Sequence, residues 1–433
     1  IMSEALETVQ TRYNPTLQEI DEKVYTYFRG YPSRPKDTIY QRALDKAAND
    51  FHLPSKVSVR HVNDVIRHYP HPERSPGLPY TALGIRRKKD VDTNQIRWDI
   101  HKIKYGKIKR FRTPCTMAVK TIVSPPEKKK FRVVWVYPVT MTILEGMFAQ
   151  PLIRAYNGNT FSPYAIWYRW HKGHMRWLNS RLTPGSSWLG IDYSAFDANV
   201  APWLIRDAFS ILRRNINFNE YEFYGIPTDS NTLPRLWRVM EDYFINTPAK
   251  MKNGEIKIKA GGVPSGSYFT NLVDSVVNSI MSHYLLLKLE IPYHEHFFMG
   301  DDGLIRFNGN LDLADFSTLA LETFGAVINP DKSEIGQYVH WLGYLLSHDR
   351  PKPDIDKLVA QLLVPSKPDR YAHDIYIRAR ALWISSFNYR PFRDLLLEHN
   401  LLTNITRVYN DETLHKLEYL DLDLQSNDAY MFV

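Results

Sequence analysis

The chain has 433 residues, of which 44% are hydrophobic and 24% are charged, as in ordinary globular proteins. This length exceeds what one hydrophobic core usually accommodates, so two or three subdomains are expected. The net charge is +8, and the stretch from Arg86 to Arg132 holds 16 basic residues against 4 acidic ones. Such a stretch fits a polyanion-binding surface and a solvated lysine-rich loop equally well.

Several protein classes are excluded. No apolar run approaches the roughly 20 residues of a membrane span, and residues 1–30 lack the apolar core of a secretory signal. Cys115 is the only cysteine, which excludes an intramolecular disulfide and a zinc site built from cysteines. A soluble protein that needs no oxidising compartment is expected. The segment from Tyr409 to Val433 is acidic, with 6 acids and 1 base.

The first third of the chain mixes helical and strand patterns. Residues 1–70 predict several helices interrupted by prolines, and the Pro- and Gly-containing segment 74–80 predicts a loop. Residues 86–130 combine basic side chains with β-formers such as Ile103. Phe131–Val136 then predicts a strand that ends before a proline.

The middle of the chain predicts a strand, a helix and a longer helix. Ser187–Ile191 reads as a strand that leads into Asp192, and Pro202 opens an amphipathic helix. After the glycine-rich segment Gly261–Gly266, the apolar spacing over Ser267–Leu289 predicts a long helix.

A hairpin with two acids at its tip follows. Residues 294–307 predict two strands joined by a turn that carries Asp301 and Asp302. Residues 316–324 predict a helix, and residues 339–346 predict a pair of short apolar strands. The C-terminal region is expected to be mostly helical.

The acids at 192, 301 and 302 would meet if their strands ended at one edge of a sheet. Carboxylates on neighbouring strands can hold two cations about 3.5–4 Å apart, the arrangement that nucleotidyl transfer requires. A Gly-Asp-Asp turn alone is weak evidence, since Asp-rich turns are common. Asp192 could equally cap the helix that follows it. That alternative does not account for Asp301, so the pairing favours a catalytic interpretation.

Taken together, the motifs resemble those of viral RNA-dependent RNA polymerases of the partitivirus and picobirnavirus type, from double-stranded RNA viruses. In the order of the family, the chain matches motif G at Ser75–Pro79, F at Lys128–Pro138, A at Asp192–Asp197, B at Gly261–Asn278, C at Phe297–Ile305, D at Asn329–Ser333 and E at Val339–Gly343. Their joint order is more specific than any single motif. The resemblance implies an α+β right-hand fold with fingers, a palm built on an antiparallel sheet and a helical thumb.

The resemblance also implies domains and a biological setting. Residues 1–150 would form the N-terminal region and fingers, 151–345 the palm with inserted fingers segments, and 346–433 the thumb and C-terminal tail. The protein would copy an RNA template into an RNA product from NTPs with Mg²⁺ or Mn²⁺, for both replication and transcription. It would act in the virion interior or the host cytoplasm, without a membrane, and a capsid protein is a candidate partner.

The roles implied for the acidic residues concern metal and sugar. Asp192, Asp301 and Asp302 would be the metal ligands. Asp197 would lie beneath the incoming ribose, where a carboxylate can accept a hydrogen bond from the 2′-hydroxyl that distinguishes RNA from DNA. Lys332 matches the lysine thought to protonate the departing pyrophosphate, although an exposed lysine after a turn needs no such role.

The remaining roles concern the nucleotide and the template. Lys130 and Arg132 would offset charge on the triphosphate. Thr270, Asp274 and Asn278 share one helix face, and the ribose with Asp197 would supply their partners. An ordinary capping loop with a solvated stripe is the alternative. The full set for nucleotide binding is Lys130, Arg132, Asp197, Ser265, Gly266, Thr270, Asp274 and Asn278; the set for template binding is Ser75, Pro76, Gly77 and Pro79.

Two other functions stay open at this point. A reverse transcriptase of a mobile element would share this architecture, but it would prefer dNTPs. Phe196 lies one residue from the position of the aromatic gate of reverse transcriptases, so a ribonucleotide user is favoured. A non-enzymatic RNA-packaging protein would bind RNA without incorporating nucleotides.

Overall fold

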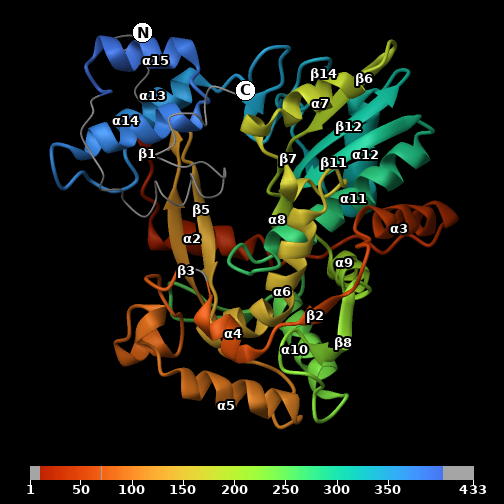
Figure 1. The fold of residues 1–433 in the computed structure, drawn as a ribbon, viewed down its shortest axis with the longest axis vertical. Coiled ribbons are helices and arrows are strands. Elements are labelled where there is room, and N and C mark those ends of the chain that lie inside the picture. Colours follow the sequence, from red (N-terminus) through yellow and green to blue (C-terminus); the bar gives the residue numbers. More distant parts are fainter. Residues whose placement is uncertain (1–9, 70, 403–433) are drawn as a thin grey trace.

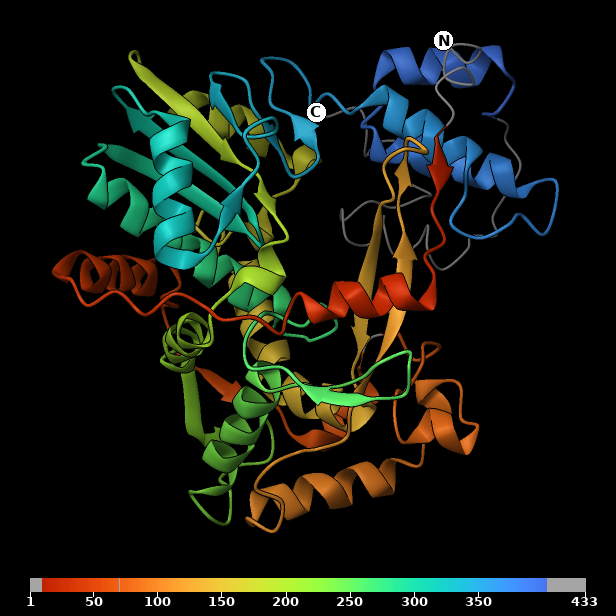
Figure 2. The same cartoon turned by 180° about the vertical axis from the view of Figure 1, so that it is seen from behind.

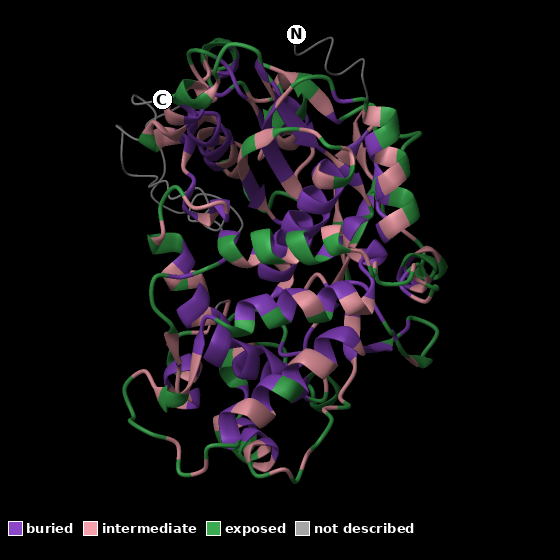
Figure 3. Ribbon diagram, turned by 90° about the vertical axis from the view of Figure 1, so that its right-hand side faces the viewer, coloured by how far each residue is buried: buried purple, intermediate pink, exposed green. Residues whose placement is uncertain are grey.

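The computed structural model describes residues 10–69 and 71–402 (Figure 1). The acidic segment from Tyr409 to Val433, whose role was left open, lies outside the described residues. Two four-stranded sheets stand on opposite sides of the molecule, with helices between them and a group of helices over the end of one sheet (Figures 1 and 2). Buried residues fill the interior segments, and exposed residues follow the outer helices and loops (Figure 3).

The helices are distributed along the whole described chain, and prolines or glycines separate several of them. They are α2 (Leu17–Tyr25), α3 (Thr38–Asp50), α4 (Val62–Arg67), α5 (Thr93–Lys104), α6 (Val139–Gly158), α7 (His174–Arg181), α8 (Phe196–Asn199), α9 (Pro202–Arg213), α10 (Thr232–Ile245), α11 (Thr270–Lys288), α12 (Leu313–Phe324), α13 (Ile355–Leu363), α14 (Asp374–Ser385) and α15 (Arg390–Glu398). Within the described ranges, none of these helices combines the length and apolar character needed to span a membrane.

The first sheet carries the acidic hairpin and is antiparallel throughout. Its strands, in spatial order, are β11 (Tyr293–Met299), β12 (Asp302–Asn308), β6 (Ser186–Ile191) and β14 (Glu334–Gly336). Side chains alternate between two cores: Ile305 and Phe307 pack toward α11, whereas Leu304 packs into an aromatic cluster with Trp188 and Trp341. Both faces are therefore covered, which fixes the register of these strands.

Several short strand pairs lie outside the two four-stranded sheets. They are β7 (Tyr193–Ser194) with β13 (Val327–Ile328), β15 (His340–Trp341) with β16 (Tyr344–Leu345), β2 (Val57–Val59) with β8 (Ile216–Tyr221) and β1 (Thr11–Arg12) with β4 (Val123–Ser124). The predicted strand at 187–191, helix after Pro202, hairpin and apolar strand pair are confirmed.

The second sheet joins segments that are distant in sequence. Its order is β10 (Ile256–Ile258), β9 (Pro248–Lys250), β3 (Cys115–Thr121) and β5 (Phe131–Val136). Strands β9 and β10, from the middle of the chain, therefore extend a sheet built mainly from its first third. The predicted strand at 131–136 is confirmed.

Ile103, named above among the β-formers of the basic segment, lies in a helix, α5. The side chain of Asp92 accepts a hydrogen bond from the Asn94 N–H and caps this helix. Ile96, Ile100 and Ile103 recur at helical spacing and are all buried. Capping and a helical apolar stripe thus override the β preference of single residues.

Helix α13 of the C-terminal group contacts β4, which lies between β3 and β5 in the chain (Figure 1). Arg12 of β1 joins the two parts, because its guanidinium donates to the carbonyl of Val364 at 2.7 Å and to the carbonyl of Thr121 at 3.0 Å. The C-terminal part of the described chain is therefore joined to the β3–β5 hairpin at this point.

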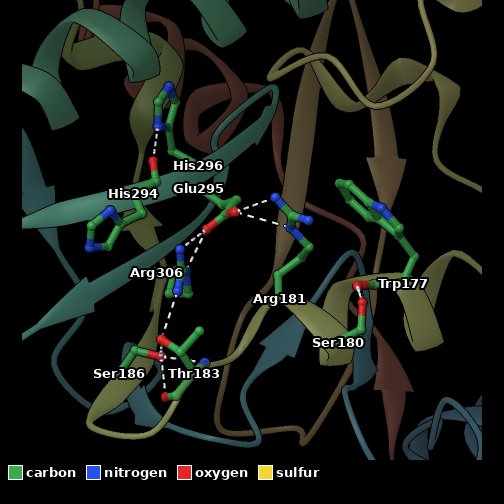
Figure 4. A network of polar contacts seen from close by, with 9 residues as sticks. All are labelled: Trp177, Ser180, Arg181, Thr183, Ser186, His294, Glu295, His296 and Arg306. Atoms are coloured by element: carbon green, nitrogen blue, oxygen red, sulfur yellow. Dashed lines mark hydrogen bonds and ion pairs between the residues drawn. The ribbon is translucent and has the colours of Figure 1, made fainter.

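An ion network holds α7 to the back of the hairpin (Figure 4). Glu295 of β11 lies between Arg306 of β12 and Arg181 of α7, with Arg181 nitrogens 2.8 and 3.0 Å from one Glu295 oxygen. Arg306 also donates to the hydroxyl of Thr183 at 2.9 Å. Arg306 is largely buried. These bonds therefore supply partners for a charge that would otherwise be costly to bury.

Lys259 is the only lysine among the described residues that is fully buried. Its ammonium group donates three hydrogen bonds: to the carbonyls of Phe244 and Ile245 at the end of α10, at 2.5 and 2.8 Å, and to the carbonyl of Gly262 at 2.8 Å. All three donors are used, and the positive charge lies at the negative end of the helix dipole. Lys259 thus fastens the glycine-rich segment to α10.

We expect Lys259→Met to lower the free energy of unfolding by about 2–4 kcal/mol, because three buried carbonyls lose a charged donor. Urea unfolding would measure the change. Lys257→Met is the matched control: Lys257 is partly exposed, and its ammonium group lies 3.7 Å from Glu255 and 4.7 Å from the centre of the Tyr25 ring, so the change in stability should be much smaller. Equal stability of the two variants would contradict this account.

Candidate active site

The register between β6 and β12 brings the predicted acids together. Ile191 pairs with Gly303 in this antiparallel ladder. The next position of the ladder therefore places Asp192 opposite Asp302, with Asp301 beside it in the hairpin turn. Residues 109 positions apart in sequence thus share one edge of the sheet.

Side chains of α11 hold the tip of the hairpin. The Ser275 hydroxyl accepts a hydrogen bond from the Gly300 N–H at 2.7 Å. The Asn278 amide donates to the carbonyls of Gly300 and Asp301 at 3.2 and 3.0 Å. Because Leu272 to Leu286 are all buried, the turn rests on a rigid support and its acids have a fixed position.

Burial and the negative charges of neighbouring carboxylates make the ionised forms of Asp301 and Asp302 unfavourable. Burial, followed by the charges of Asp301 and Asp192, raises the pKa of Asp302 to about 7. Burial also raises the pKa of Asp301, which Arg132 partly opposes. The carboxylates at this edge of the sheet are hard oxygen donors of the kind that Mg²⁺ and Mn²⁺ prefer. This donor set fits a divalent cation, which would relieve the repulsion between them.

A second carboxyl pair lies next to the first. Asp197 and Asp274 interact with each other, and burial raises the pKa of Asp197 to about 6 and that of Asp274 well above its ordinary value. Because two negative charges repel each other in a buried site, we expect one of the two carboxyl groups to hold a proton. The Oδ1 atom of Asp274 is buried and finds no partner in the described part of the chain. The pair is therefore equipped to bind one more hydroxyl group.

The glycine-rich loop connects the motif that contains Asp197 with β5. The Val263 N–H donates to the carbonyl of Asp197 at 2.7 Å. The Ser265 hydroxyl donates to the carbonyl of Val133 at 3.0 Å. A Cβ atom on Gly266 would lie 1.7 Å from the Trp135 carbonyl oxygen. Only glycine allows this contact, so the loop lies directly on the strand that carries Arg132.

Basic residues from three parts of the molecule face the acids. Lys130 and Arg132 are exposed at the end of the β3–β5 hairpin. The charge of Arg132 lowers the pKa values of the aspartates at 197, 301 and 302, against the effect of burial. Burial and the charge of Lys332 lower the pKa of Lys130, which Asp192 opposes. The charge of Lys357 in α13 also lowers the pKa values of Lys130 and Asp302. Together these cations form a site suited to polyphosphate.

The segment that carries Lys332 is fastened to the end of β6. The Ser333 hydroxyl accepts from the Asp192 N–H at 3.1 Å, and the Asn329 N–H donates to the Asp192 carbonyl at 2.8 Å. Lys332 itself is exposed. The backbone of Asp192 is therefore fixed on both sides, while its carboxylate is left for other partners.

The predicted template loop packs against the start of α6. The Val139 N–H donates to the carbonyl of Pro76 at 2.8 Å, and the Gly77 N–H donates to the hydroxyl of Ser75 at 3.2 Å. Gly77 has φ +67°, and a Cβ there would lie 2.7 Å from the Tyr137 carbonyl oxygen. Only glycine meets both demands. Pro79 follows in the same loop.

A cluster of Asp50, His283 and His296 is the one group in the described ranges that has three possible metal ligands close together. Both histidines bond to Asp50 through Nε2, at 2.6 and 2.7 Å, while their Nδ1 atoms meet the Tyr293 hydroxyl and the His294 carbonyl. The Ser279 hydroxyl completes the Asp50 contacts at 2.8 Å. Every polar atom is satisfied by these hydrogen bonds, so the cluster needs no metal to be stable.

The chain matches the family described as "Viral RNA-dependent RNA polymerase" over residues 2–399. It belongs to this family. The polymerase is 26% identical over 481 residues to the RNA-directed RNA polymerase of Cryptosporidium parvum virus 1 (strain KSU-1), covering 96% of this chain and 86% of the relative. It is 25% identical over 325 residues to that of White clover cryptic virus 1 (isolate Boccardo/2004), covering 66% of this chain and 53% of the relative.

Solved structures give the same fold. The RNA-dependent RNA polymerase of a human picobirnavirus superposes with a TM-score of 0.70 at 16% identity, covering 91% of this chain and 76% of that one. Its insertion-loop deletion mutant superposes with a TM-score of 0.65. The expected family, enzyme class and right-hand α+β fold are confirmed. The reverse transcriptase and packaging-protein alternatives are set aside.

Two of the three polar residues on α11 form hydrogen bonds with groups other than Asp197. The Thr270 hydroxyl donates to the carbonyls of Pro264 and Ser267, at 2.7 and 3.0 Å, and Asn278 supports the hairpin turn. Of the three polar residues on α11, only Asp274 reaches Asp197. Helix spacing predicts which residues share a face, but it does not show which of them a neighbouring backbone engages first.

Sequence reasoning also missed residues whose partners are remote in sequence. Ser275 and Lys357 carry no local motif, and Lys259 looks like any other lysine of a basic chain. Glu145 lies in an apolar helix and touches the loop before α11. For Glu145, the one available signal was a lone acid in an otherwise apolar stretch, 139–153.

We expect Gly266→Ala to reduce RNA synthesis at least about tenfold, because the new methyl group would displace the loop from β5. Gly158→Ala is the control: nothing lies within 4 Å of a Cβ at Gly158, at the end of α6. Nucleotide incorporation on a primed RNA template would compare the variants, with melting temperature as a check on folding. Full activity of Gly266→Ala would contradict the close contact.

Proposed function

We propose that this polymerase copies an RNA template by two-metal nucleotidyl transfer, with Asp192, Asp301 and Asp302 as the metal ligands. The observation that carries the proposal is the β6–β12 register, which places carboxylates from two motifs at one edge of the sheet. Mg²⁺ or Mn²⁺ bound there would neutralise phosphate charge and favour ionisation of the attacking hydroxyl.

In the reaction, the 3′-oxygen of the growing strand forms a bond to the α-phosphorus of the incoming NTP. The bond from that phosphorus to the bridging oxygen breaks, and pyrophosphate leaves with the electron pair. The hydroxyl proton passes to solvent. Lys332, exposed beside the end of β6, is positioned to give a proton to pyrophosphate. Lys130 and Arg132 offset charge on the phosphate oxygens throughout.

Selection of ribose is assigned to Asp197 and Asp274. The buried Oδ1 atom of Asp274 has no hydrogen-bond partner in the described part of the chain, and a ribose 2′-hydroxyl could donate to it. Ser265 and Gly266 would line the same nucleotide, because their loop connects Asp197 with β5. Thr270 and Asn278 would support this site from α11.

The template is assigned to the loop formed by Ser75, Pro76, Gly77 and Pro79, which is packed on the start of α6. The partners of the polymerase would be the RNA template and product, with a capsid protein as a further candidate. Replication and transcription would take place in the virion interior or the host cytoplasm.

Asp301→Asn should abolish nucleotide incorporation while leaving RNA affinity nearly intact, because the substitution removes a metal ligand and does not change the basic surfaces. Incorporation and filter binding with the same RNA would be measured in parallel. Asp45→Asn, at an exposed site on α3, is the matched control. Synthesis by Asp301→Asn at the rate of the parent enzyme would refute the site.

Asp274→Ala should reduce the preference for NTPs over dNTPs about tenfold or more, since a site built around a hydroxyl group loses its partner. The ratio of kcat/KM values for one matched NTP and dNTP pair measures this effect. Ser279→Ala, further along α11 and bonded to Asp50, should leave the ratio unchanged. An unaltered ratio in Asp274→Ala would remove this residue from sugar recognition.

A further inference from the structure

A buried carboxyl group outside the proposed catalytic set touches the loop before α11. Glu145 of α6 is 1% exposed. One of its oxygens accepts a hydrogen bond from the Ser267 hydroxyl, and the other accepts from the Tyr268 N–H at 3.3 Å. The Ser267 oxygen in turn accepts from the Phe269 N–H at 3.0 Å. Glu145 thus anchors three successive residues of the loop.

The start of α11 explains why such an anchor is needed. The first N–H groups of a helix have no partner within it, and a side chain at the N-cap usually accepts one of them. Phe269 holds the N-cap position and makes no side-chain hydrogen bond there. Glu145 supplies an oxygen acceptor just before this position, from a helix more than 100 residues away in sequence.

The surroundings of Glu145 favour its uncharged form. Burial raises its pKa to about 8, against the opposing effect of Ser267 and Tyr268. Positive charges affect only its neighbours: Arg60 lowers the pKa of Tyr268, and Lys259 lowers the pKa of Cys115. The ionisable groups that interact with the carboxyl group are phenols and a thiol, all with raised pKa values: Tyr137, Tyr243, Tyr268 and Cys115.

The other end of the loop is held by the same stretch of chain. Ser265 and Gly266 lie on the carbonyls of Val133 and Trp135 in β5, and β5 runs directly into α6. The Glu145 contacts begin one residue after Gly266. One continuous segment, 131–146, therefore holds the loop on both sides of the position assigned to the nucleotide.

We propose that Glu145 is a positioning residue that fixes the 265–269 loop where it can hold the incoming nucleotide against the template. This inference rests on the proposed function of that loop. Glu145 itself is buried behind the loop and is not assigned a contact with the nucleotide.

Single-nucleotide incorporation at pH 7 tests the positioning role. Glu145→Ala should raise KM for the NTP about tenfold with a smaller change in kcat, because the loop loses two hydrogen bonds. Glu145→Gln should restore the parent KM, since an amide can replace an uncharged carboxyl group. The control is Glu241→Gln on α10, a half-buried acid whose pKa burial also raises but which faces Trp237.

If Glu145→Ala does not fold, Ser267→Ala gives the same test with the carboxyl group intact, and its KM should rise by a smaller factor. An unchanged KM in the folded variant would overturn the proposal. Asp301→Asn in the same assay keeps the two ideas apart: its activity tests the metal site, whereas the KM of Glu145→Ala tests only the loop.

The pH dependence tests the uncharged form. Between pH 7 and 9 the carboxyl group of the parent enzyme loses its proton, whereas Glu145→Gln cannot. The ratio of kcat/KM for the parent to that for Glu145→Gln should therefore fall as the pH rises through about 8. A constant ratio over this range would overturn the assignment of the uncharged form.

Discussion

The antiparallel register between β6 and β12 is the constraint on which the catalytic site depends. A slip of one residue would turn every side chain of a strand to the opposite face and separate Asp192 from Asp302. The two apolar faces of the sheet oppose such a slip, because Ile305 and Leu304 pack into different cores. Hydrophobic burial therefore fixes the position of acids that repel each other, and stability of the sheet supports a locally unfavourable arrangement of charge.

Segment 131–146 organises the rest of the proposed nucleotide site. It carries Arg132, accepts the glycine-rich loop on the carbonyls of β5, and receives the template loop through the Val139 N–H. Most of these contacts use backbone atoms. Side chains that face solvent in this segment can therefore change without loss of the scaffold, whereas changes in backbone path would disturb template, nucleotide and loop together.

Sequence reasoning located features that depend on local patterns. The short, largely apolar run of β6, the turn at Asp301 and the long apolar helix α11 are local, and all three were predictable. The helix around Ile103 was not, because a single cap at Asp92 outweighed the β preference of its residues. The partners of Asn278, Lys259 and Glu145 were not predictable either, since their hydrogen bonds join segments that only the complete fold brings together.

The contact between Gly266 and the Trp135 carbonyl has a consequence for motion. A loop that already lies against a rigid strand has no room to advance toward it, so any displacement during the catalytic cycle must lead away from β5. The contact therefore limits how far the loop can move toward β5. A loop that returned to this contact after each nucleotide addition would take the same position beside every successive base pair.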